Sequence, residues 1–394
     1  MKKKLEDYWE DVVTCGHCRA CTVMNWHVME EWVPSCPAGE YWDWEAFYCV
    51  GRIEMARAVM EDELENSELL QEIVYSCTTC GACAATCLIF KGMDTVGVIE
   101  ALREEMVKRE WMPPRHIQLV KDTESLHNPY AEKHESRVEW APKDVIDSGA
   151  KTAYFVGCTS SYRQKDIAKT TADILKKIGI EYTILKDEWC CGSPLLRTGN
   201  TELGKKLAKH NIELMKENGI EEIVFSCAGC YRTFRTDYQE MFDEELGFKV
   251  YHIVEYLYKL MKDGKLEFKN PINMKVTYHD PCHIGRHIKK NGLIKGIFKE
   301  PRKILEAIPG IELIEMPRNK ENAWCCGAGG GVKATFRDFA VETANDRIKE
   351  AVETEADALV STCPFCARNL MDAIEEYNHN IEFYDLVELV NKAL

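Results

Sequence analysis

The sequence predicts an α-helical N-terminal part followed by two copies of an α/β unit with a parallel sheet. From residue 151 onward, short runs of β-branched and aromatic residues alternate with helix-like stretches, as in βαβ units. The same order of runs, helices and cysteines then occurs a second time, and an internal duplication is the simplest explanation. The length of 394 residues suits two or three domains.

Each copy is expected to place strands at its apolar runs and helices between them. The first copy has runs at 153–158, 182–185 and 223–227 and helix-like stretches at 167–178 and 203–216. The second has runs at 276–278, 311–315 and 358–363, helix-like stretches at 304–308 and 339–351, and a tail at 383–388 that resembles 250–255. Because ligands of parallel sheets gather beyond the carboxyl ends of strands, the cysteines there should face one place: Cys158, Cys227, Cys282 and Cys363.

The distribution of cysteines also suggests the domain boundaries. We expect a cysteine-rich N-terminal domain at 1–94, a helical connector at 95–150, a first α/β domain at 151–270 and a second at 271–394. The connector contains no cysteine, starts as a helix at 96–109 and breaks at Pro113-Pro114.

Composition narrows the class of protein. A formal net charge of −15 argues against nucleic acid as a partner, because phosphate neutralisation needs a basic surface. The 19 cysteines do not indicate a secreted disulfide scaffold, since the chain is long and no signal sequence is expected. No apolar run approaches the ~18 residues of a membrane span. We therefore expect a cytoplasmic protein whose cysteines hold metal and which reaches a membrane only through a partner subunit.

Two cysteine motifs in the N-terminal part have the spacing of a bacterial-type ferredoxin. The second reads Cys77-x2-Cys80-x2-Cys83-x3-Cys87, and Cys15-x2-Cys18-x2-Cys21 is a matching first half. Three thiolates on one loop reach three corners of a cubane, and the fourth cysteine crosses to the other cluster. The spacing predicts two cubane [4Fe–4S] clusters, one held by Cys15, Cys18, Cys21 and Cys87 and the other by Cys77, Cys80, Cys83 and Cys36.

Two cysteines compete for the fourth position of the second cubane. Cys36 is separated from Cys21 by residues 22–35, a longer stretch than in ferredoxins, and is followed by Pro37 as the motif expects. Cys49 lacks that proline, and we interpret it as a free core thiol. A pair of structural zinc sites is the alternative, although zinc needs four ligands and each loop offers three.

Each α/β copy contributes a further set of five cysteines. The first set is Cys158, Cys190, Cys191, Cys227 and Cys230, and the second is Cys282, Cys325, Cys326, Cys363 and Cys366. Five thiolates exceed what a tetrahedral zinc ion or a simple cubane can use. Adjacent cysteines could serve neighbouring irons, so the pattern favours a larger or distorted iron–sulfur cluster in each copy.

This paired pattern resembles the cysteine-rich CCG domain, and the chain from residue 10 to 394 is similar to the D-type subunit of heterodisulfide reductase. The segments that carry the resemblance are 189–192, 226–231, 279–283, 325–331 and 363–366. The resemblance implies an N-terminal α-helical two-cluster ferredoxin-like domain followed by two duplicated α/β CCG domains with parallel sheets. It also implies that each five-cysteine set holds a noncubane [4Fe–4S] cluster, and that the pair of clusters acts on a disulfide.

The function implied is that of an oxidoreductase subunit in a multi-subunit complex of anaerobic metabolism. Electrons would enter through the cubanes and reach the noncubane pair, which reduces or forms a small disulfide. An alternative is an electron relay that links a flavoprotein dehydrogenase or aromatic-CoA reductase to a quinone, cytochrome or ferredoxin. Nothing resembles a GxGxxG fingerprint after a strand, so any flavin is expected in a partner, either a flavoprotein, a ferredoxin-type protein or a membrane cytochrome subunit. No catalytic side chain beyond the cluster ligands is predicted.

Two smaller features have competing interpretations. The run Gly327-Ala328-Gly329-Gly330-Gly331 could bind an anion, but we interpret it as bare backbone whose N–H groups approach cluster sulfurs. His279, His283 and His287 recur at every fourth residue and could act as ligands or proton donors. Because Pro281 interrupts any helix there, local hydrogen bonding is the favoured interpretation.

Overall fold

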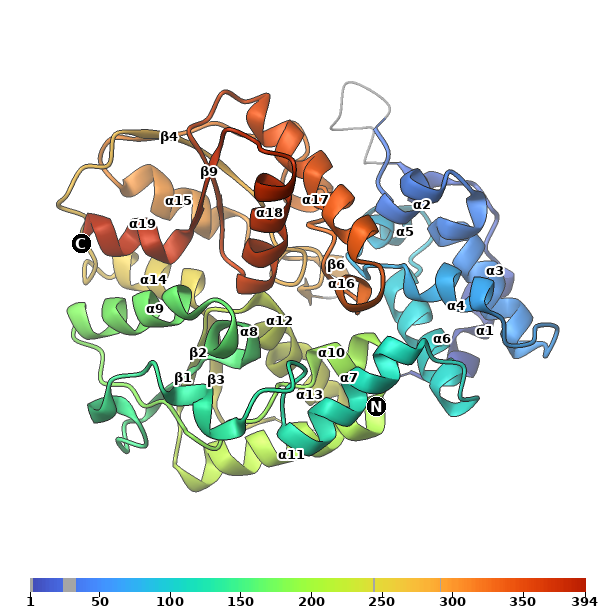
Figure 1. Ribbon diagram of the computed structural model, residues 1–394, viewed down its shortest axis with the longest axis horizontal. Coiled ribbons are helices and arrows are strands. Elements are labelled where there is room, and N and C mark those ends of the chain that lie inside the picture. Colours follow the sequence, from blue (N-terminus) through green and yellow to red (C-terminus); the bar gives the residue numbers. More distant parts are fainter. Residues whose placement is uncertain (1–2, 24–32, 244, 291) are drawn as a thin grey trace.

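A computed structural model describes residues 3–23, 33–243, 245–290 and 292–394. The chain forms a helical N-terminal part and two α/β units, and the N-terminal helices lie at one end of the molecule beside both units (Figure 1). Residues 24–32, which include most of the long stretch between Cys21 and Cys36, lie outside the described residues.

The described residues of the N-terminal part form helices joined by loops, with one isolated antiparallel bridge between Val23 and Pro34. Side chains cap two of its helices: Ser67 accepts a hydrogen bond from the Leu70 N–H at 3.1 Å, and Asp94 accepts one from the Gly97 N–H at 3.2 Å. The helices are α1 (Trp9–Val13), α2 (Pro37–Trp42), α3 (Cys49–Met60), α4 (Glu68–Tyr75), α5 (Ala82–Phe90) and α6 (Thr95–Lys108), with 3-10 turns at Leu5–Tyr8, Ala20–Thr22 and Glu45–Phe47. The predicted helix at 96–109 is α6 within one residue.

The connector contains one further helix. The chain breaks at Pro113 as expected, but α7 (Pro114–Leu126) begins at the second proline, which suits the first turn of a helix because its missing N–H has no intrahelical partner there. His127 ends α7 in the left-handed region with φ 57°. Two 3-10 turns follow, at His134–Val138 and Lys143–Val145.

The first α/β unit contains a parallel sheet of three strands in the order β1-β2-β3. Thr152 of β1 pairs with Glu222 of β2, which pairs with Lys249 of β3. The elements are β1 (Thr152–Phe155), α8 (Gly157–Tyr162), α9 (Lys165–Lys177), α10 (Ser193–Arg197), α11 (Thr201–Glu217), β2 (Glu222–Phe225), α12 (Ala228–Arg232), a π-helical turn (Thr233–Asp237), α13 (Tyr238–Phe242), β3 (Lys249–His252) and α14 (Ile253–Lys262).

The second unit contains a parallel sheet of four strands in the order β7-β4-β8-β9. Val276 of β4 pairs with Leu313 of β7 on one side and with Ala358 of β8 on the other. The elements are β4 (Met274–Tyr278), the antiparallel pair β5 (Lys289–Lys290) and β6 (Leu293–Ile294), α15 (Lys299–Ala307), β7 (Ile311–Leu313), a 3-10 turn (Lys320–Asn322), α16 (Val332–Thr335), α17 (Arg337–Val352), β8 (Ala358–Ser361), α18 (Pro364–Glu376), β9 (Glu382–Asp385) and α19 (Leu386–Ala393).

One predicted strand is shorter than expected. The run 182–185 corresponds to β7 of the second unit, yet it forms only two isolated parallel bridges, Ala153 with Thr183 and Ile146 with Ile184. Thr183 is nevertheless hydrogen-bonded to β1. The Tyr154 N–H donates to the Thr183 carbonyl and the Thr183 N–H donates to the Thr152 carbonyl, both at 2.9 Å. The segment lies between β1 and the stretch around Ile146, and it pairs with each of them through a single residue.

The tails of the two units show the same local design. In each, the residue that ends the last strand caps the helix that follows, and a glutamate three residues later accepts a hydrogen bond from its backbone N–H. The pairs are His252 with Glu255 and Asp385 with Glu388. One continuous buried core joins the two units, with Phe225 and Ile253 from the first and Leu359 and Leu386 from the second. The shared cap and core support the duplication predicted from the sequence.

Among the described residues, no single helix has the length and apolar character to cross a membrane. The pair Ala82–Phe90 and Thr95–Lys108 meets that criterion together, but it is bent by 119°.

Candidate metal centres

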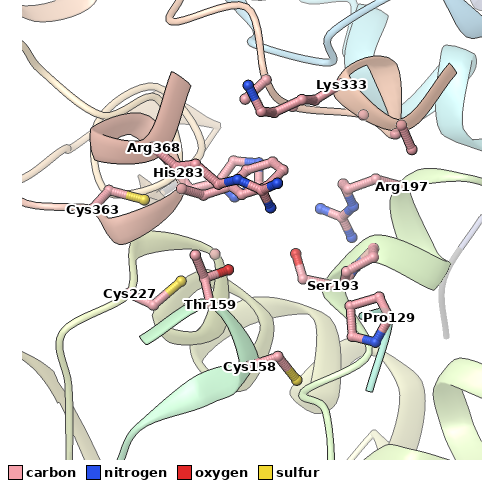
Figure 2. A pocket seen from close by; sticks show the side chains of 18 of the residues that line it. Pro129, Cys158, Thr159, Ser193, Arg197, Cys227, His283, Lys333, Cys363 and Arg368 are labelled. Atoms are coloured by element: carbon pink, nitrogen blue, oxygen red, sulfur yellow. The ribbon is translucent and has the colours of Figure 1, made fainter. Parts of the chain in front are cut away.

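The ten cysteines of the two α/β units line one cavity of about 450 Å³ between the units. Loops and the first turns of helices after the carboxyl ends of the strands supply most of them, including Cys158 in α8, Cys230 in α12 and Cys366 in α18. The carboxyl ends of both sheets therefore point at the same space. Figure 2 shows the sulfurs of Cys158 and Cys227 on the side of the first unit and Cys363 with His283 on the side of the second. The cysteines after the strands thus meet where the sequence predicted.

In the first set, the five side chains form a contiguous group. Cys158 lies within hydrogen-bonding reach of Cys190, and Cys191 lies within reach of both Cys190 and Cys230. Cys227 in turn contacts Cys230. A buried ion pair borders the group: the Arg137 guanidinium donates to Cys158 Sγ at 3.3 Å and to Glu188 at 2.5 Å.

In the second set, the contacts follow the same order. Cys326 lies within hydrogen-bonding reach of Cys325 and Cys366, and Cys363 lies within reach of Cys366. Cys282 is close enough to Cys326 for their charges to interact. The glycine after each cysteine pair donates to a sulfur, Gly192 N–H to Cys190 at 3.5 Å and Gly327 N–H to Cys325 at 3.3 Å. The backbone donation to sulfur predicted for the glycine run is confirmed at Gly327.

The two N-terminal sets differ in exposure. Cys36, Cys77, Cys80 and Cys83 line one small internal cavity, and Cys49 lines it too. Cys18 is exposed and Cys15, Cys21 and Cys87 are half-buried, with Cys87 close enough to the other three for their charges to interact. The structure therefore brings Cys15, Cys18, Cys21 and Cys87 together, and it places Cys77, Cys80 and Cys83 beside both candidates for the fourth position, Cys36 and Cys49.

Cys49 lies between these two groups. Its thiol is 2% exposed and within hydrogen-bonding reach of Cys21 in one group and Cys83 in the other. Burial raises the pKa of the Cys36 thiol to about 12, so binding of a metal there must displace a proton.

The four sets follow one another through direct side-chain contacts. Cys80 of the second N-terminal set lies within hydrogen-bonding reach of Cys325 in the second α/β unit. Cys325 Sγ also donates to Thr78 Oγ1 at 3.4 Å. Cys363 then contacts Cys227 of the first unit. Any clusters held by these cysteines would lie in one row, from the exposed N-terminal group to the cavity.

The glycine run permits this close approach. A Cβ atom on Gly329 would lie 2.6 Å from the Thr78 carbonyl oxygen, and one on Gly330 would lie 2.5 Å from the Cys77 carbonyl oxygen. A larger residue at either position would therefore push the loop that carries Cys77 and Cys80 away from the second unit. Packing against this loop is a role of the run that the sequence did not reveal.

The donors fit iron–sulfur clusters. Within the described residues, the ligand atoms that line the second N-terminal cavity are cysteine sulfurs, which iron–sulfur clusters require. Two mixed groups could hold a metal ion, His279 with Cys326 and Cys366, and Cys282 with His283 and His287. The Nδ1 of His279 accepts a hydrogen bond at 3.2 Å from Arg347, which is distant in the sequence. The buried Nε2 atoms of His283 and His287 have no hydrogen-bond partner among the described residues, so the expected local hydrogen bonding is not what these histidines show.

Polar side chains complete the wall of the cavity: His283, which the sequence analysis named, and Lys333, Arg197 and Arg368, which it did not. Burial lowers the pKa of His283 to about 4, so this imidazole is neutral at pH 7. Lys333 is held by Asp372 at 2.5 Å, and Arg197 by Asp237 at 2.8 Å. Arg368 also lines the cavity, over the ring of Tyr130 at 5.6 Å. The one sequence signal that could have identified two of these residues is their position. Arg368 comes two residues after Cys366, and Lys333 comes two residues after the glycine run.

The paired cysteine sets at the ends of two parallel sheets define an iron–sulfur protein built from CCG domains. The family model described as CCG, cysteine-rich domain, matches residues 152–235 and 276–371. The D-type subunit of dihydromethanophenazine:CoB–CoM heterodisulfide reductase from Methanosarcina acetivorans is 44% identical over 340 residues, which cover 84% of this chain and 81% of that protein. The chain therefore belongs to the family of D-type heterodisulfide reductase subunits and is an oxidoreductase-type subunit.

Other relatives show how widely this architecture is used. The B-type subunit of the fumarate reductase (CoM/CoB) of Methanothermobacter marburgensis is 31% identical over 401 residues, covering 99% of this chain and 74% of that protein. The EtfAB:quinone oxidoreductase of Syntrophomonas wolfei is 28% identical over 358 residues, covering 85% of this chain and 48% of that protein. Relatives of this chain thus include electron-transfer oxidoreductases as well as heterodisulfide reductases.

Proposed function

We propose that this chain is the disulfide-reducing subunit of a redox complex. Four clusters would deliver electrons to the disulfide, and in the reverse direction they would take up the electrons released when two thiols form a disulfide. The observation that carries the proposal is the single cavity lined by both complete five-cysteine sets. Cys227 of one set contacts Cys363 of the other, so both proposed clusters could reach the sulfurs of one small disulfide.

The proposed ligand sets are those predicted from the sequence. Cys15, Cys18, Cys21 and Cys87 would hold the first cubane, and Cys36, Cys77, Cys80 and Cys83 the second. The five cysteines of each α/β unit would hold one noncubane [4Fe–4S] cluster. When bound, the clusters supply one-electron transfer and open iron positions for sulfur.

The chain itself would hold and orient the substrate. Overall, the reaction converts one disulfide, two electrons and two protons into two thiols. Arg368 and Lys333 on the cavity wall favour a disulfide with anionic ends, such as the heterodisulfide named in the relatives. The products can leave as thiolates and take their protons from water, so no strong general acid is needed. His283, which lines the cavity, is neutral at pH 7 and need not supply a proton.

The proposed route for electrons starts at the first N-terminal set, where Cys18 is exposed. Ile89 and Phe90, just after Cys87, are 64% and 49% exposed and provide an apolar contact area for a partner subunit. The partner proposed there is a flavoprotein, a ferredoxin-type protein or a membrane cytochrome subunit.

An electron relay is the second candidate function. The EtfAB:quinone oxidoreductase among the relatives supports it, because that name describes transfer between a flavoprotein and a quinone. In this case both five-cysteine sets would carry electrons without binding a disulfide.

Assay of the anaerobically prepared, cluster-loaded protein separates these functions. Reduced viologen is supplied together with disulfides that have anionic, neutral or cationic ends. Turnover with anionic disulfides supports the proposal, and Arg368→Gln should raise KM for them at least about tenfold. The exposed Arg337→Gln serves as the matched control and should behave as wild type. Fast reduction by a flavoprotein without turnover of any disulfide supports the relay, and zinc in place of iron and acid-labile sulfide refutes both.

A further inference from the structure

Three buried arginines distinguish the second N-terminal set from its surroundings. Eight arginines in the described part of the chain are buried: Arg52, Arg103, Arg137, Arg197, Arg232, Arg286, Arg302 and Arg347. Five of these form ion pairs with carboxylates. Arg52, Arg103 and Arg286 form none with any described residue, although they are 1%, 0% and 3% exposed.

All three guanidinium groups instead reach the segment that carries the second N-terminal set. Arg52 donates to the Ile73 carbonyl at 2.7 Å and to Ser76 Oγ at 2.9 Å, and its Nη1 lies 4.0 Å from Cys36 Sγ. It thereby lies between the end of α4 and the cysteine proposed as the fourth ligand.

Arg103 joins three parts of the chain at one point. Its guanidinium donates to the carbonyls of Val74 at 2.8 Å, Cys77 at 2.6 Å, Arg197 at 2.7 Å and Gly330 at 2.9 Å. These carbonyls come from the N-terminal part and from both α/β units. The charge of Arg103 therefore cannot move away from Cys77.

Arg286 binds the opposite end of the same loop. Its Nε donates to the Cys80 carbonyl at 2.9 Å, and its Nη1 donates to the carbonyls of Glu321 at 3.1 Å and Ala323 at 2.6 Å. Its charge interacts with Cys80, Cys282 and Cys325. It thus lies at the boundary between the second N-terminal set and the second α/β set.

Buried cations without a counter-charge are unfavourable, and arginine does not deprotonate in proteins. Carbonyl dipoles satisfy the N–H groups but not the net charge. Negative charge here can come from the thiolates of Cys36, Cys77, Cys80 and Cys83. Arg103 also interacts with the charge of Glu100, and Arg286 with those of Asp280, Cys282 and Cys325. A cubane with four thiolates carries a formal charge of about −2 when oxidised and about −3 when reduced. Three fixed cations therefore favour the reduced form over the oxidised form.

The first N-terminal set has a different environment. Among the described residues near it, Arg19 is exposed and is already paired with Glu45 at 2.6 Å, and Lys91, whose Nζ lies near Gly16, is exposed. Cys18 is exposed, so water and salt screen charge at that set. The charge of the bound cluster there would be offset by solvent rather than by fixed cations.

We propose that Arg52, Arg103 and Arg286 raise the reduction potential of the cluster held by Cys36, Cys77, Cys80 and Cys83 above that of the first cubane. This inference rests on the cluster assignment proposed above. One electron would then pass from the first cubane to the second with no proton and no bond change. Burial of an anionic cluster acts in the opposite direction, and the three guanidinium groups outweigh it because they are fixed and unscreened. The electron would be held beside Cys325, next to the cavity.

An anaerobic redox titration of the full, cluster-loaded chain tests this, followed by electron paramagnetic resonance without any disulfide present. Cys18→Ser removes the first cubane and so assigns the two cubane signals. In the wild type, we expect the second cubane to be reduced first. In Arg286→Gln, the ratio of reduced to oxidised second cubane at a fixed potential should fall about tenfold, which is about 59 mV for one electron. Arg286→Lys should recover part of this shift, and the exposed Arg19→Gln should leave both cubanes unchanged.

Other results overturn the inference. It fails if the wild-type second cubane has the lower potential, or if Arg286→Gln loads fully and shifts neither cubane. If Arg286→Gln does not load its clusters, the inference is tested by the order in which the two wild-type cubanes are reduced, which needs no arginine variant. Arg103→Lys then provides a second test. Iron and acid-labile sulfide are measured in parallel. A wild-type protein that binds fewer than two cubanes contradicts the proposed function, whereas two cubanes in the reverse order contradict this inference alone.

Discussion

The two α/β units have the same five-cysteine set and the same capped tail, but their cysteines have different neighbours. In the first unit, Cys158 is bordered by the Arg137–Glu188 ion pair, which lies entirely within the unit and the connector. In the second, Cys325 contacts Cys80 of the N-terminal part, and the nearby Arg286 is not paired with a described carboxylate. The duplicated sites are therefore chemically alike and positioned differently.

The source of this difference is local and can be read from the residues after each cysteine pair. The first unit continues from Gly192 into Ser193 and Pro194, which start α10. The second continues from Gly327 into the glycine run, whose missing side chains let the Cys77–Cys80 loop approach. A few residues thus make the two five-cysteine sets unequal: a cysteine of the second set contacts the second N-terminal set, whereas the first set contacts the cysteines of the second unit.

Serine substitutions at equivalent cysteines test whether the two α/β sites are equally needed for disulfide turnover, and they have the largest expected effect. Cys326→Ser and Cys191→Ser should each remove or alter one noncubane signal in electron paramagnetic resonance. Disulfide turnover should fall more than about 100-fold in both, because loss of a ligand exceeds the effect of changing an outer partner. Both variants should retain the cubane signals, and loss of these signals would contradict the ligand assignment.

Alanine substitutions at equivalent glycines should lower the free energy of unfolding more in the second unit than in the first. Gly327 and Gly192 have nearly the same φ, 82° and 83°, so the backbone strain should cost each variant about 1 kcal/mol. A Cβ on Gly327 would also lie 2.2 Å from the Ala340 carbonyl oxygen, whereas one on Gly192 has 3.4 Å to the nearest atom. We expect Gly327→Ala to lower the free energy of unfolding by about 3 kcal/mol or more.

Urea unfolding of the loaded protein measures this difference. Gly247→Ala is the matched control, because Gly247 has φ 84° and no atom within 4 Å of an added Cβ. It should reproduce the cost of Gly192→Ala. Equal costs at Gly327 and Gly247 would show that the second unit relaxes around the new methyl group.

The pH dependence of stability should report the contact between the connector and the glycine run. His116 interacts with the Gly331 carbonyl at 3.0 Å, and burial lowers its pKa to about 4, from about 6.5 in the unfolded chain. The unfolded state therefore binds more protons between these values, so stability is complete above pH 6.5 and decreases as the pH falls. From pH 7.5 to 5.5 this histidine should remove about 1 kcal/mol from the free energy of unfolding.

His116→Gln should have a correspondingly flatter profile over that range. The first unit supplies the control in His210, a half-buried residue of α11 whose Nε2 donates to the Asp187 carbonyl at 2.8 Å. His210→Gln should keep the wild-type slope. A His116→Gln profile as steep as that of the wild type would show that other groups cause the acid sensitivity.

The sequence predicted most of the repeated architecture because hydrophobic runs and cysteine spacing are local signals. The runs at 223–227 and 358–363 coincide with β2 and β8, and the ten cysteines of the repeats meet as expected. The short pairing of 182–185 was not predictable, because edge pairing depends on the neighbouring segment at Ile146.

The arginines around the second N-terminal set could not be predicted for a similar reason. Arg52, Arg103 and Arg286 come from three distant parts of the chain and belong to no motif. Only the fold shows that each reaches the same loop. The cysteine ligands themselves were accessible from spacing, whereas the charges that surround them are set by tertiary packing.

The smallest expected effect concerns Cys49, the one cysteine left over when the four sets are assigned. Cys49 and Cys36 line the same cavity, so their position alone does not choose the fourth ligand. Pro37 after Cys36 and the Arg52 guanidinium 4.0 Å from its sulfur favour Cys36. Cys49→Ala should therefore retain the iron and sulfide of four clusters and lose only about 1 kcal/mol of stability. Cys36→Ala should lose the second cubane, because the cluster cannot be held without its fourth ligand. Loss of that cubane in Cys49→Ala and its retention in Cys36→Ala would instead identify Cys49 as the ligand.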